Sequence, residues 1–186
     1  MAKRFSWIIY ASLLVLVLIA VVMALRRPNA TLVRASAQET NSFDEKIQSL
    51  ALAHQQGATR TVHITEAELT SKLQQGLDEI PPVEGAVVLK AASVHLEGGE
   101  FVGVFTLDAS GIELFLTMAG ALGVQDGRLL IQPNSASLGQ LPLPAPVFER
   151  ILQRQFDSPD TRERLRLPDF IKDVRVENGE LLVQAE

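Results

Sequence analysis

The residues with side chains suited to catalysis or metal binding stand far apart in this sequence of 186 residues. The three histidines are His54, His63 and His95, and none belongs to an H-E-x-x-H pair or a comparable metal-binding spacing. There are no cysteines, which excludes disulfide bonds, thiol catalysis and cysteine-based metal sites. Ser110-Gly111 lacks the preceding glycine of a nucleophile elbow. We therefore expect no metal and no cofactor.

The charged side chains that could form a catalytic or phosphate-binding site are also explained by simple exposure to solvent. Three carboxylates fall at the ends of predicted strands, where solvation explains them: Glu97, Glu100 and Asp108. Arg150 and Arg154 lie one helical turn apart and could hold a phosphate, although neighbouring acidic residues favour a solvated helix face. The glycines match neither a dinucleotide-binding nor a phosphate-binding loop. We expect a protein that is not an enzyme; a carboxylate pair formed only on folding is the remaining alternative.

A long uncharged segment near the N-terminus decides where the rest of the chain lies. Residues 7–25 contain no charge, proline or glycine. As a helix they would extend about 28 Å, close to the ~30 Å of a bilayer's hydrocarbon core. Trp7 and Tyr10 stand near one end, where aromatic rings favour the lipid headgroups. The segment predicts a single transmembrane helix.

The orientation of this helix decides which side of the membrane the remaining residues occupy. Basic residues flank it on both sides, so the positive-inside rule is nearly balanced. We expect an uncleaved signal anchor in the cell membrane, with the N-terminus cytoplasmic and the domain extracytoplasmic. The alternatives are a signal peptide cleaved near Ala35-Ser36-Ala37 and a cytoplasmic domain. The expected organisation is a tail at 1–6, the anchor at 7–25, a linker at 26–41 and one domain at 42–186.

The charge of the chain is distributed unevenly. It is −5 overall, and residues 1–34 hold five basic residues and no acid, so the remainder carries −10. Phosphate backbones repel such an acidic domain, and we therefore exclude nucleic acid as a partner. The expected partners are the membrane through residues 7–25, a phospholipid or other lipid, and an envelope protein.

Two helices are predicted before the strand-rich part of the domain. Ser42 and Glu45 have the spacing of a capping box, which predicts a helix over 42–57. A short strand at 61–65 leads into a second helix, whose capping box is formed by Thr65 and Glu68. Three leucines then recur at every fourth residue: Leu69, Leu73 and Leu77. Such a stripe needs a partner surface, so we expect it to be buried against the concave face of a sheet.

Strand and turn patterns predict an antiparallel meander after residue 87. The expected strands cover 87–97, 100–107, 112–121 and 129–132, the last extended by 135–138. Two-residue hairpin turns are marked by Asp126-Gly127 and by Asn178-Gly179. The second turn joins a final pair of strands at 172–176 and 180–184, and Pro146 is placed to begin a helix. The fold class is therefore α+β, with one curved antiparallel sheet and two or three helices.

The strands carry more apolar side chains than a sheet wetted on one face needs. Either helices cover the second face, or that face lines an apolar groove. The candidate groove residues are the apolar residues in excess, together with the leucine stripe that they would face: Leu69, Leu73, Leu77, Val102, Val104, Phe105, Leu114, Leu116 and Met118. A groove wide enough for an acyl chain would make this a lipid-binding module. A dry core would instead indicate a structural or interaction scaffold of the cell envelope.

Three stretches give the chain a resemblance to a known family. They are HITEAELTSKLQQGL at 63–77, DGRLLIQPNSASLGQLPLPAPVFERIL at 126–152 and LPDFIKDVRVENGELLVQ at 167–184. The chain resembles the YpmS-like family of bacterial membrane-anchored proteins and, more distantly, the LmeA-like phospholipid-binding proteins. This resemblance implies a relative of the tubular lipid-binding (TULIP-like) fold, in which a curved antiparallel sheet wraps around a long helix beside an apolar groove. It supplies no catalytic residues.

Overall fold

Three long helices and eight strands make up the part of the chain that the structure describes. This structure is a computed structural model, and it describes residues 2–28, 33–78, 87–148, 163 and 165–186. The helices are α1 (Ala2–Leu25), α2 (Ala37–Gln55) and α3 (Glu66–Asp78). The strands are β1 (Arg60–Ile64), β2 (Val88–Glu97), β3 (Glu100–Ala109), β4 (Ile112–Gln125), β5 (Arg128–Leu138), β6 (Leu141–Pro142), β7 (Ile171–Glu177) and β8 (Glu180–Ala185). A helical turn at 145–148 follows β6.

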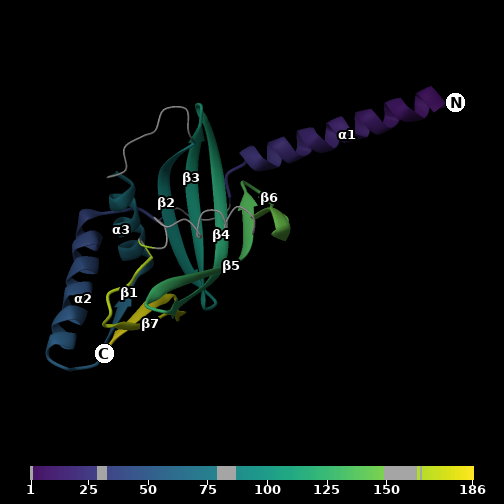
Figure 1. The fold of residues 1–186 in the computed structure, drawn as a ribbon. Helices are drawn as coiled ribbons and strands as arrows, with labels where there is room; N and C mark the ends of the chain where they lie inside the picture. The colour runs from purple at the N-terminus through teal and green to yellow at the C-terminus, as the bar shows by residue number, and fades with distance from the viewer. Residues whose placement is uncertain (1, 29–32, 79–86, 149–162, 164) are drawn as a thin grey trace.

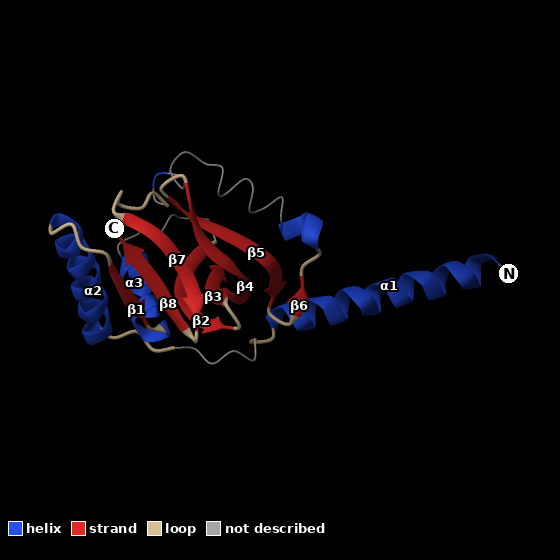
Figure 2. Cartoon of the chain, turned by 90° about the horizontal axis from the view of Figure 1, so that it is seen from below, coloured by secondary structure: helices blue, strands red, loops and turns tan. Residues whose placement is uncertain are grey.

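The strands form two antiparallel sheets rather than one. The meander makes a curved five-stranded sheet in the order β2-β3-β4-β5-β6, and a three-stranded sheet has the order β1-β8-β7 (Figures 1 and 2). The α+β class and the curved antiparallel sheet are thus confirmed, but the expectation of a single sheet is wrong. The final hairpin does not extend the meander, because β1 pairs with residues 181–185 of β8 and gives the hairpin its own partner strand.

The hairpin turns lie where the sequence predicts them. Asp126 and Gly127 have φ values of 51° and 68°, and Asn178 and Gly179 have φ values of 54° and 80°. Two successive positive φ angles define the turn whose twist matches a right-handed β-ribbon, and Asn-Gly and Asp-Gly are the pairs that adopt it most readily. These two turns therefore set the pairing next to them, Gln125 with Arg128 and Glu177 with Glu180, and each register shifts further along its ladder.

Helix α2 begins earlier than the capping-box pattern predicts. Its N-cap is Ser36, whose hydroxyl accepts a hydrogen bond from the backbone N–H of Glu39 at 3.2 Å. The predicted cap, Ser42, lies inside the helix and donates its hydroxyl to Glu68 instead. The prediction failed because both serines stand three residues before a glutamate, and a pattern alone does not rank them. The capping box of Thr65 and Glu68 is confirmed, with bonds of 2.8 and 3.3 Å.

The core lies between the three-stranded sheet and one half of the five-stranded sheet. Its buried members come from both sheets and from α2: Leu50, Val62, Ile64, Val94, Leu96, Phe101, Ile171, Val174, Val176, Leu181, Val183 and Ala185. The contributions from β2 and β3 come from the ends of those strands near the Gly98-Gly99 turn. The other half of the five-stranded sheet adds no residue to this cluster.

Helix α3 packs along the edge of the five-stranded sheet and not on its face. Three polar side chains one turn apart bond to the backbone of the edge strand β2: Glu66 accepts from the N–H of Leu96 at 2.7 Å, Thr70 from Val94 at 2.9 Å and Gln74 from Ala92 at 3.3 Å. They pair backbone groups that an open edge would leave free. The predicted burial of the whole leucine stripe is wrong, because only Leu69 packs against the core. Leu73 is 40% exposed, and the buried residues of α3 are Glu68, Thr70 and Ser71.

Helix α1 projects away from the two sheets (Figure 1). Among the residues that the structure describes, none of the helices is both long enough and apolar enough to cross a membrane. The predicted span at 7–25 is therefore unsupported and stays a prediction. The helix predicted to start at Pro146 is described only as the turn at 145–148, and the pair Arg150 and Arg154 lies outside the described residues.

Candidate functional site

The pairing registers divide the side chains of the five-stranded sheet between two faces. Directly paired residues share a face, and successive residues along a strand alternate between faces. Pairing of Phe105 with Leu116 and of Leu107 with Leu114 puts these four residues on the face that holds the core, which we call the core face. The opposite face, which we call the linker face, carries Val102, Val104, Thr106, Phe115 and Thr117.

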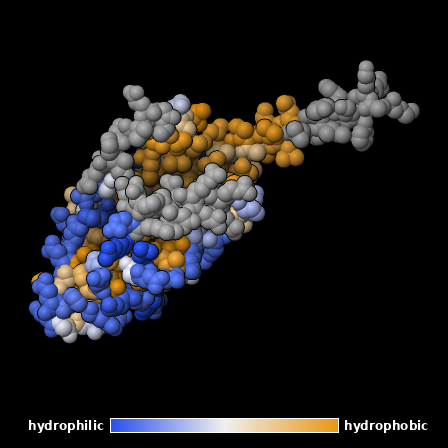
Figure 3. Space-filling model, viewed as in Figure 1, coloured by the Kyte–Doolittle hydropathy of each residue, from blue (hydrophilic) through white to orange (hydrophobic). Residues whose placement is uncertain are grey.

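Half of the core face is apolar and lies outside the described core. This half, the apolar half-face, is made of seven half-buried residues: Leu89, Phe105, Leu107, Leu114, Leu116, Met118 and Leu138. In Figure 3, apolar side chains gather over the upper part of β2 to β4 and continue onto the described part of α1. Four of the predicted groove residues, Phe105, Leu114, Leu116 and Met118, are therefore brought together on one surface.

The ring of Phe105 lies across Gly103, at the boundary between the core and the apolar half-face. A Cβ atom at Gly103 would stand 2.9 Å from Cε2 of that ring, too close for real contact. Gly103 also pairs with Met118 across the β3–β4 ladder. The glycine therefore leaves room for the Phe105 ring above the backbone of β3.

Two predicted groove residues lie on the other side of the sheet. Val102 and Val104 belong to the linker face, and Val104 is fully buried, with 0% exposure. Two residues, one from either end of the connection between α1 and α2, contact this face: Arg27 stacks on the ring of Phe115 at 5.6 Å, and the N–H of Val33 bonds to Ser93 at 3.0 Å. The predicted set therefore does not form one surface, because alternation along β3 separates these valines from Phe105.

The leucine stripe of α3 runs from the core towards the apolar half-face along the edge of β2. Leu69 packs against the core cluster, whereas Leu73 is exposed and Leu77 is half-buried. The order of the hydrogen bonds from α3 to Leu96, Val94 and Ala92 shows that the helix runs antiparallel to β2. Its last turns therefore reach the level of Leu89, at one border of the half-face.

Glu68 is the buried charged group among the described residues, and it joins two helices. Glu68 is buried between α3 and α2, where Lys46 donates to its carboxylate at 2.7 Å and Ser42 donates as well. Burial raises the pKa of Glu68, but the hydrogen bonds from Lys46, Ser42 and the backbone of Thr65 lower it by more, so the net pKa lies below the ordinary value.

The histidines are not gathered into a metal site. His63 bonds to Glu180 at 2.9 Å and His54 to the carbonyl of Glu186 at 2.7 Å, so each meets a different partner. His95 lies 3.4 Å from Glu66. In the portion of the chain described, no three histidine or carboxylate side chains group as metal ligands would.

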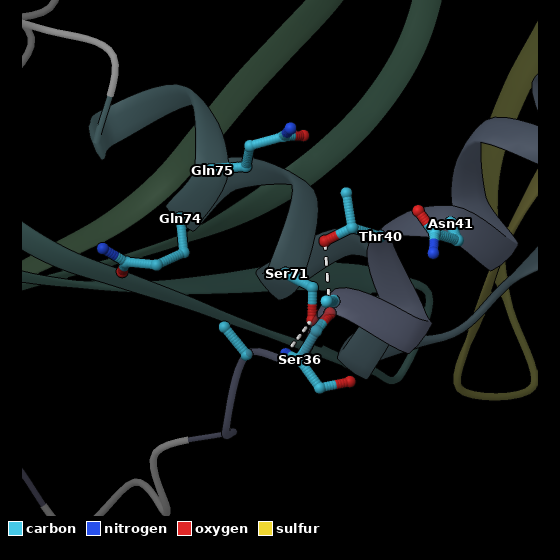
Figure 4. Close-up of a pocket in the computed structure, with 8 residues that line it drawn as sticks. Ser36, Thr40, Asn41, Ser71, Gln74 and Gln75 are labelled. Carbon is cyan, nitrogen blue, oxygen red and sulfur yellow. Dashed lines mark hydrogen bonds between the residues drawn. The ribbon is translucent and has the colours of Figure 1, made fainter.

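A pocket of about 330 Å³ lies between the start of α2 and the last turns of α3. Its lining includes Ser36, Thr40, Asn41, Ser71, Gln74 and Gln75 (Figure 4). The N–H of Ser36 donates to the hydroxyl of Ser71 at 2.9 Å, and the hydroxyl of Thr40 donates to the carbonyl of Ser36 at 3.2 Å. The first bond joins the N-cap of α2 to α3, and the second lies within the first turn of α2, so Ser71 and Thr40 have structural roles at this pocket.

Comparison with known proteins identified no relative of this chain. No protein-family model matches the chain, and neither the curated proteins nor the solved structures gave a match. The resemblance to YpmS-like and LmeA-like proteins therefore stays a prediction.

The sequence prediction missed three members of the half-face, although the signals were present. A two-residue turn at Ser110-Gly111 pairs Ala109 with Ile112, and counting back from it pairs Leu107 with Leu114. The same count puts Val102 and Val104 on the opposite face of the sheet from Phe105. Leu89 and Leu138 are harder to find, because a β-bulge shifts the register of each strand.

Proposed function

We propose that this chain is a membrane-anchored extracytoplasmic protein, not an enzyme, that binds the acyl chain of a membrane lipid on the apolar half-face. The observation that carries the proposal is the division of the core face. One half packs against the three-stranded sheet, and the other presents seven half-buried apolar side chains outside that core. Large contiguous apolar patches are rare on the surfaces of monomeric proteins, and where they occur they usually mark a binding site.

The chemistry of the half-face favours an apolar ligand. Its seven members are aliphatic residues, one methionine and one phenylalanine, and they offer no charge. Burial of each CH₂ group of an acyl chain contributes ~0.8 kcal/mol, so burying ten contributes roughly 8 kcal/mol before ordering costs. This free energy is sufficient for micromolar binding, as 1 μM corresponds to about −8.2 kcal/mol.

The membrane anchor is proposed from α1 and from the uncharged segment 7–25. The first described side chains of α1 are apolar and face solvent: Leu14, Leu16 and Leu18 are 61–68% exposed. A soluble helix with such side chains would lose the hydrophobic stabilisation that a bilayer supplies. We propose the N-terminus in the cytoplasm and residues 42–186 outside the cell membrane.

The substitution Leu116→Trp tests lipid binding. The larger side chain would fill an open groove at little cost, whereas it would overpack a solid core by ~1–3 kcal/mol. The matched control is Leu130→Trp, at a half-buried leucine of β5 that pairs with Gly123 on the linker face. The assay is titration of the full chain in amphipol with dansyl-undecanoic acid, whose emission rises in apolar surroundings.

We expect saturable binding to the unmodified chain and to the control, and at least an approximately tenfold weaker affinity for Leu116→Trp, or ~1.4 kcal/mol. No saturable binding to the unmodified chain, together with a lowered melting temperature for Leu116→Trp, would contradict the proposal and support an envelope scaffold with a solid core.

A further inference from the structure

The turn between β5 and β6 receives the C-terminal end of α1. The backbone N–H of Gln140 donates to the carbonyl of Met23 at 2.9 Å. The side-chain amide of Gln140 donates to the carbonyl of Arg27 at 3.3 Å. The last carbonyls of an α-helix lack i+4 partners within it and are paired by caps, water or other groups. Here Gln140, more than a hundred residues away in sequence, donates to the helix carbonyl of Met23, which also accepts from the N–H of Arg26 at 3.3 Å, and to the carbonyl of Arg27, two residues beyond the helix.

Gly139 allows this approach. A Cβ atom there would lie 2.6 Å from the carbonyl oxygens of Met23 and Arg26 and still closer to that of Ala24. These distances are shorter than any real Cβ contact, so any other residue would push the helix end away. The N–H of Gly139 is in turn bonded to the carbonyl of Phe115 at 2.6 Å, which ties the turn to β4.

A second contact holds the chain just beyond the helix on the linker face. The guanidinium of Arg27 stacks over the Phe115 ring at 5.6 Å and lies 3.6 Å from the carboxylate of Glu113. The guanidinium contact is exposed and weak by itself. Together with the bonds of Gln140 to Met23 and Arg27, it attaches the C-terminal end of α1 and the residues just after it to β4 and to the β5–β6 turn.

This docking site borders the apolar half-face. Leu138 directly precedes Gly139 and pairs with Leu116, so a half-face residue stands next to the turn that holds α1. In Figure 3 the apolar surface of the domain runs without interruption into the described part of α1. If α1 is the membrane anchor and is fixed here, it would hold the apolar half-face close to the membrane surface.

We propose that Gly139 and Gln140 form a socket that locks the domain onto its own anchor, so that the apolar half-face takes up its lipid directly from the adjacent bilayer. This inference rests on the proposed function and extends it by naming the source of the ligand and the residues that orient the site. The chain's lack of cysteine makes the docking measurable, because every label position can be introduced separately.

The test compares Gly139→Ala with Gly98→Ala in the full chain. Both glycines have nearly the same φ, 57° and 60°, but a Cβ atom at Gly98 has no atom within 4 Å. The control therefore carries the backbone strain without the overlap. Spin labels on Val17→Cys in α1 and Leu52→Cys in α2, both exposed, report the distance between anchor and domain in nanodiscs. Gln140→Glu is a second variant, which replaces the donor towards Arg27 by an acceptor.

We expect one narrow distance distribution for the unmodified chain and for Gly98→Ala, and a broad one for Gly139→Ala and Gln140→Glu. Uptake of a fluorescent phospholipid from vesicles should fall roughly tenfold or more in Gly139→Ala, because strain and overlap together disfavour the docked state. Binding of soluble dansyl-undecanoic acid should stay unchanged.

Each contrary result has a separate meaning. A narrow distribution in Gly139→Ala would overturn the socket. A broad distribution with unchanged uptake from vesicles would overturn the orienting role. If the unmodified chain binds neither probe, the proposed function and the orienting role both fail, while the distances still decide whether the socket exists.

Discussion

Thr70 is the residue through which the packing of α3 on β2 can be tested most directly. Its side chain is buried, with 1% exposure. Its hydroxyl accepts a hydrogen bond from the N–H of Val94 at 2.9 Å and donates a long one to the carbonyl of Val94 at 3.5 Å. Thr70→Val keeps the shape of the side chain and removes both polar contacts. The N–H of Val94 then stays buried without its partner from α3.

The expected cost follows from the unpaired donor. Leaving a buried donor unsatisfied costs about 1–3 kcal/mol, which exceeds the small gain from burying one more methyl group. For a domain of this size, each kcal/mol lowers the melting temperature by roughly 2–4 °C. We therefore expect Thr70→Val to lower the free energy of unfolding by about 1–3 kcal/mol.

Thr117→Val is the matched control. The hydroxyl of Thr117 is also buried, but it has no hydrogen-bond partner within the described ranges. The same chemical change there removes a desolvated polar atom and should be neutral or stabilising. The assay is guanidinium unfolding of the full chain in detergent, with the midpoint and slope compared between the two variants. Equal losses in both variants, or none in Thr70→Val, would refute the view that side chains of α3 complete the edge of β2.

Two further predictions concern pH dependence and topology. The pKa of Glu68 is lower in the folded protein than its ordinary value of 4.5, so the stabilisation from its carboxylate is complete above that value and is lost as the pH falls through the folded pKa. Glu68→Gln should therefore make the free energy of unfolding less sensitive to acid between pH 3 and 6. An unchanged pH profile would contradict this prediction. For topology, protease added to intact cells should digest residues 42–186 while a reporter fused at Met1 stays protected, and protection of Glu186 would contradict the proposed orientation.

Local signals in the sequence predicted local structure correctly. The Asp126-Gly127 and Asn178-Gly179 turns and the Thr65–Glu68 capping box depend on residues within a few positions of each other. Their backbone angles and hydrogen bonds follow from residue type and spacing, with little influence from the rest of the fold.

The arrangement of α3 could not be predicted in this way. Its leucine stripe suggested a helix lying on a sheet, but of the three leucines only Leu69 packs against the core. The hydrogen bonds to β2 come from Glu66, Thr70 and Gln74, which follow the same four-residue period on another side of the helix. Sequence periodicity shows which residues share a side, and it does not show which side meets the neighbour. Likewise, nothing local to Gly139 indicates that the end of α1 packs there.

Only some of the candidate groove residues share one surface, because apolar character does not show which face of a sheet a residue occupies. Phe105, Leu114, Leu116 and Met118 lie on one surface, as expected from their apolar character and their shared face. Val104 was included because it is apolar, although alternation puts it on the opposite face, which Arg27 and Val33 contact and where Val104 is fully buried. Apolar side chains inside a sheet serve both cores and ligand sites, and only the covering elements distinguish the two uses.

The central claim, that the apolar half-face binds lipid, is tested most directly by photo-crosslinking in a membrane. The full chain would be placed in vesicles that contain a phospholipid with a diazirine group in its acyl chain, irradiated, and mapped by peptide mass spectrometry. We predict adducts on the strands that carry Phe105, Leu114, Leu116 and Met118, in addition to those on α1, and their loss in Leu116→Trp. Adducts confined to α1 would show that the bilayer meets the anchor alone, and would contradict the account.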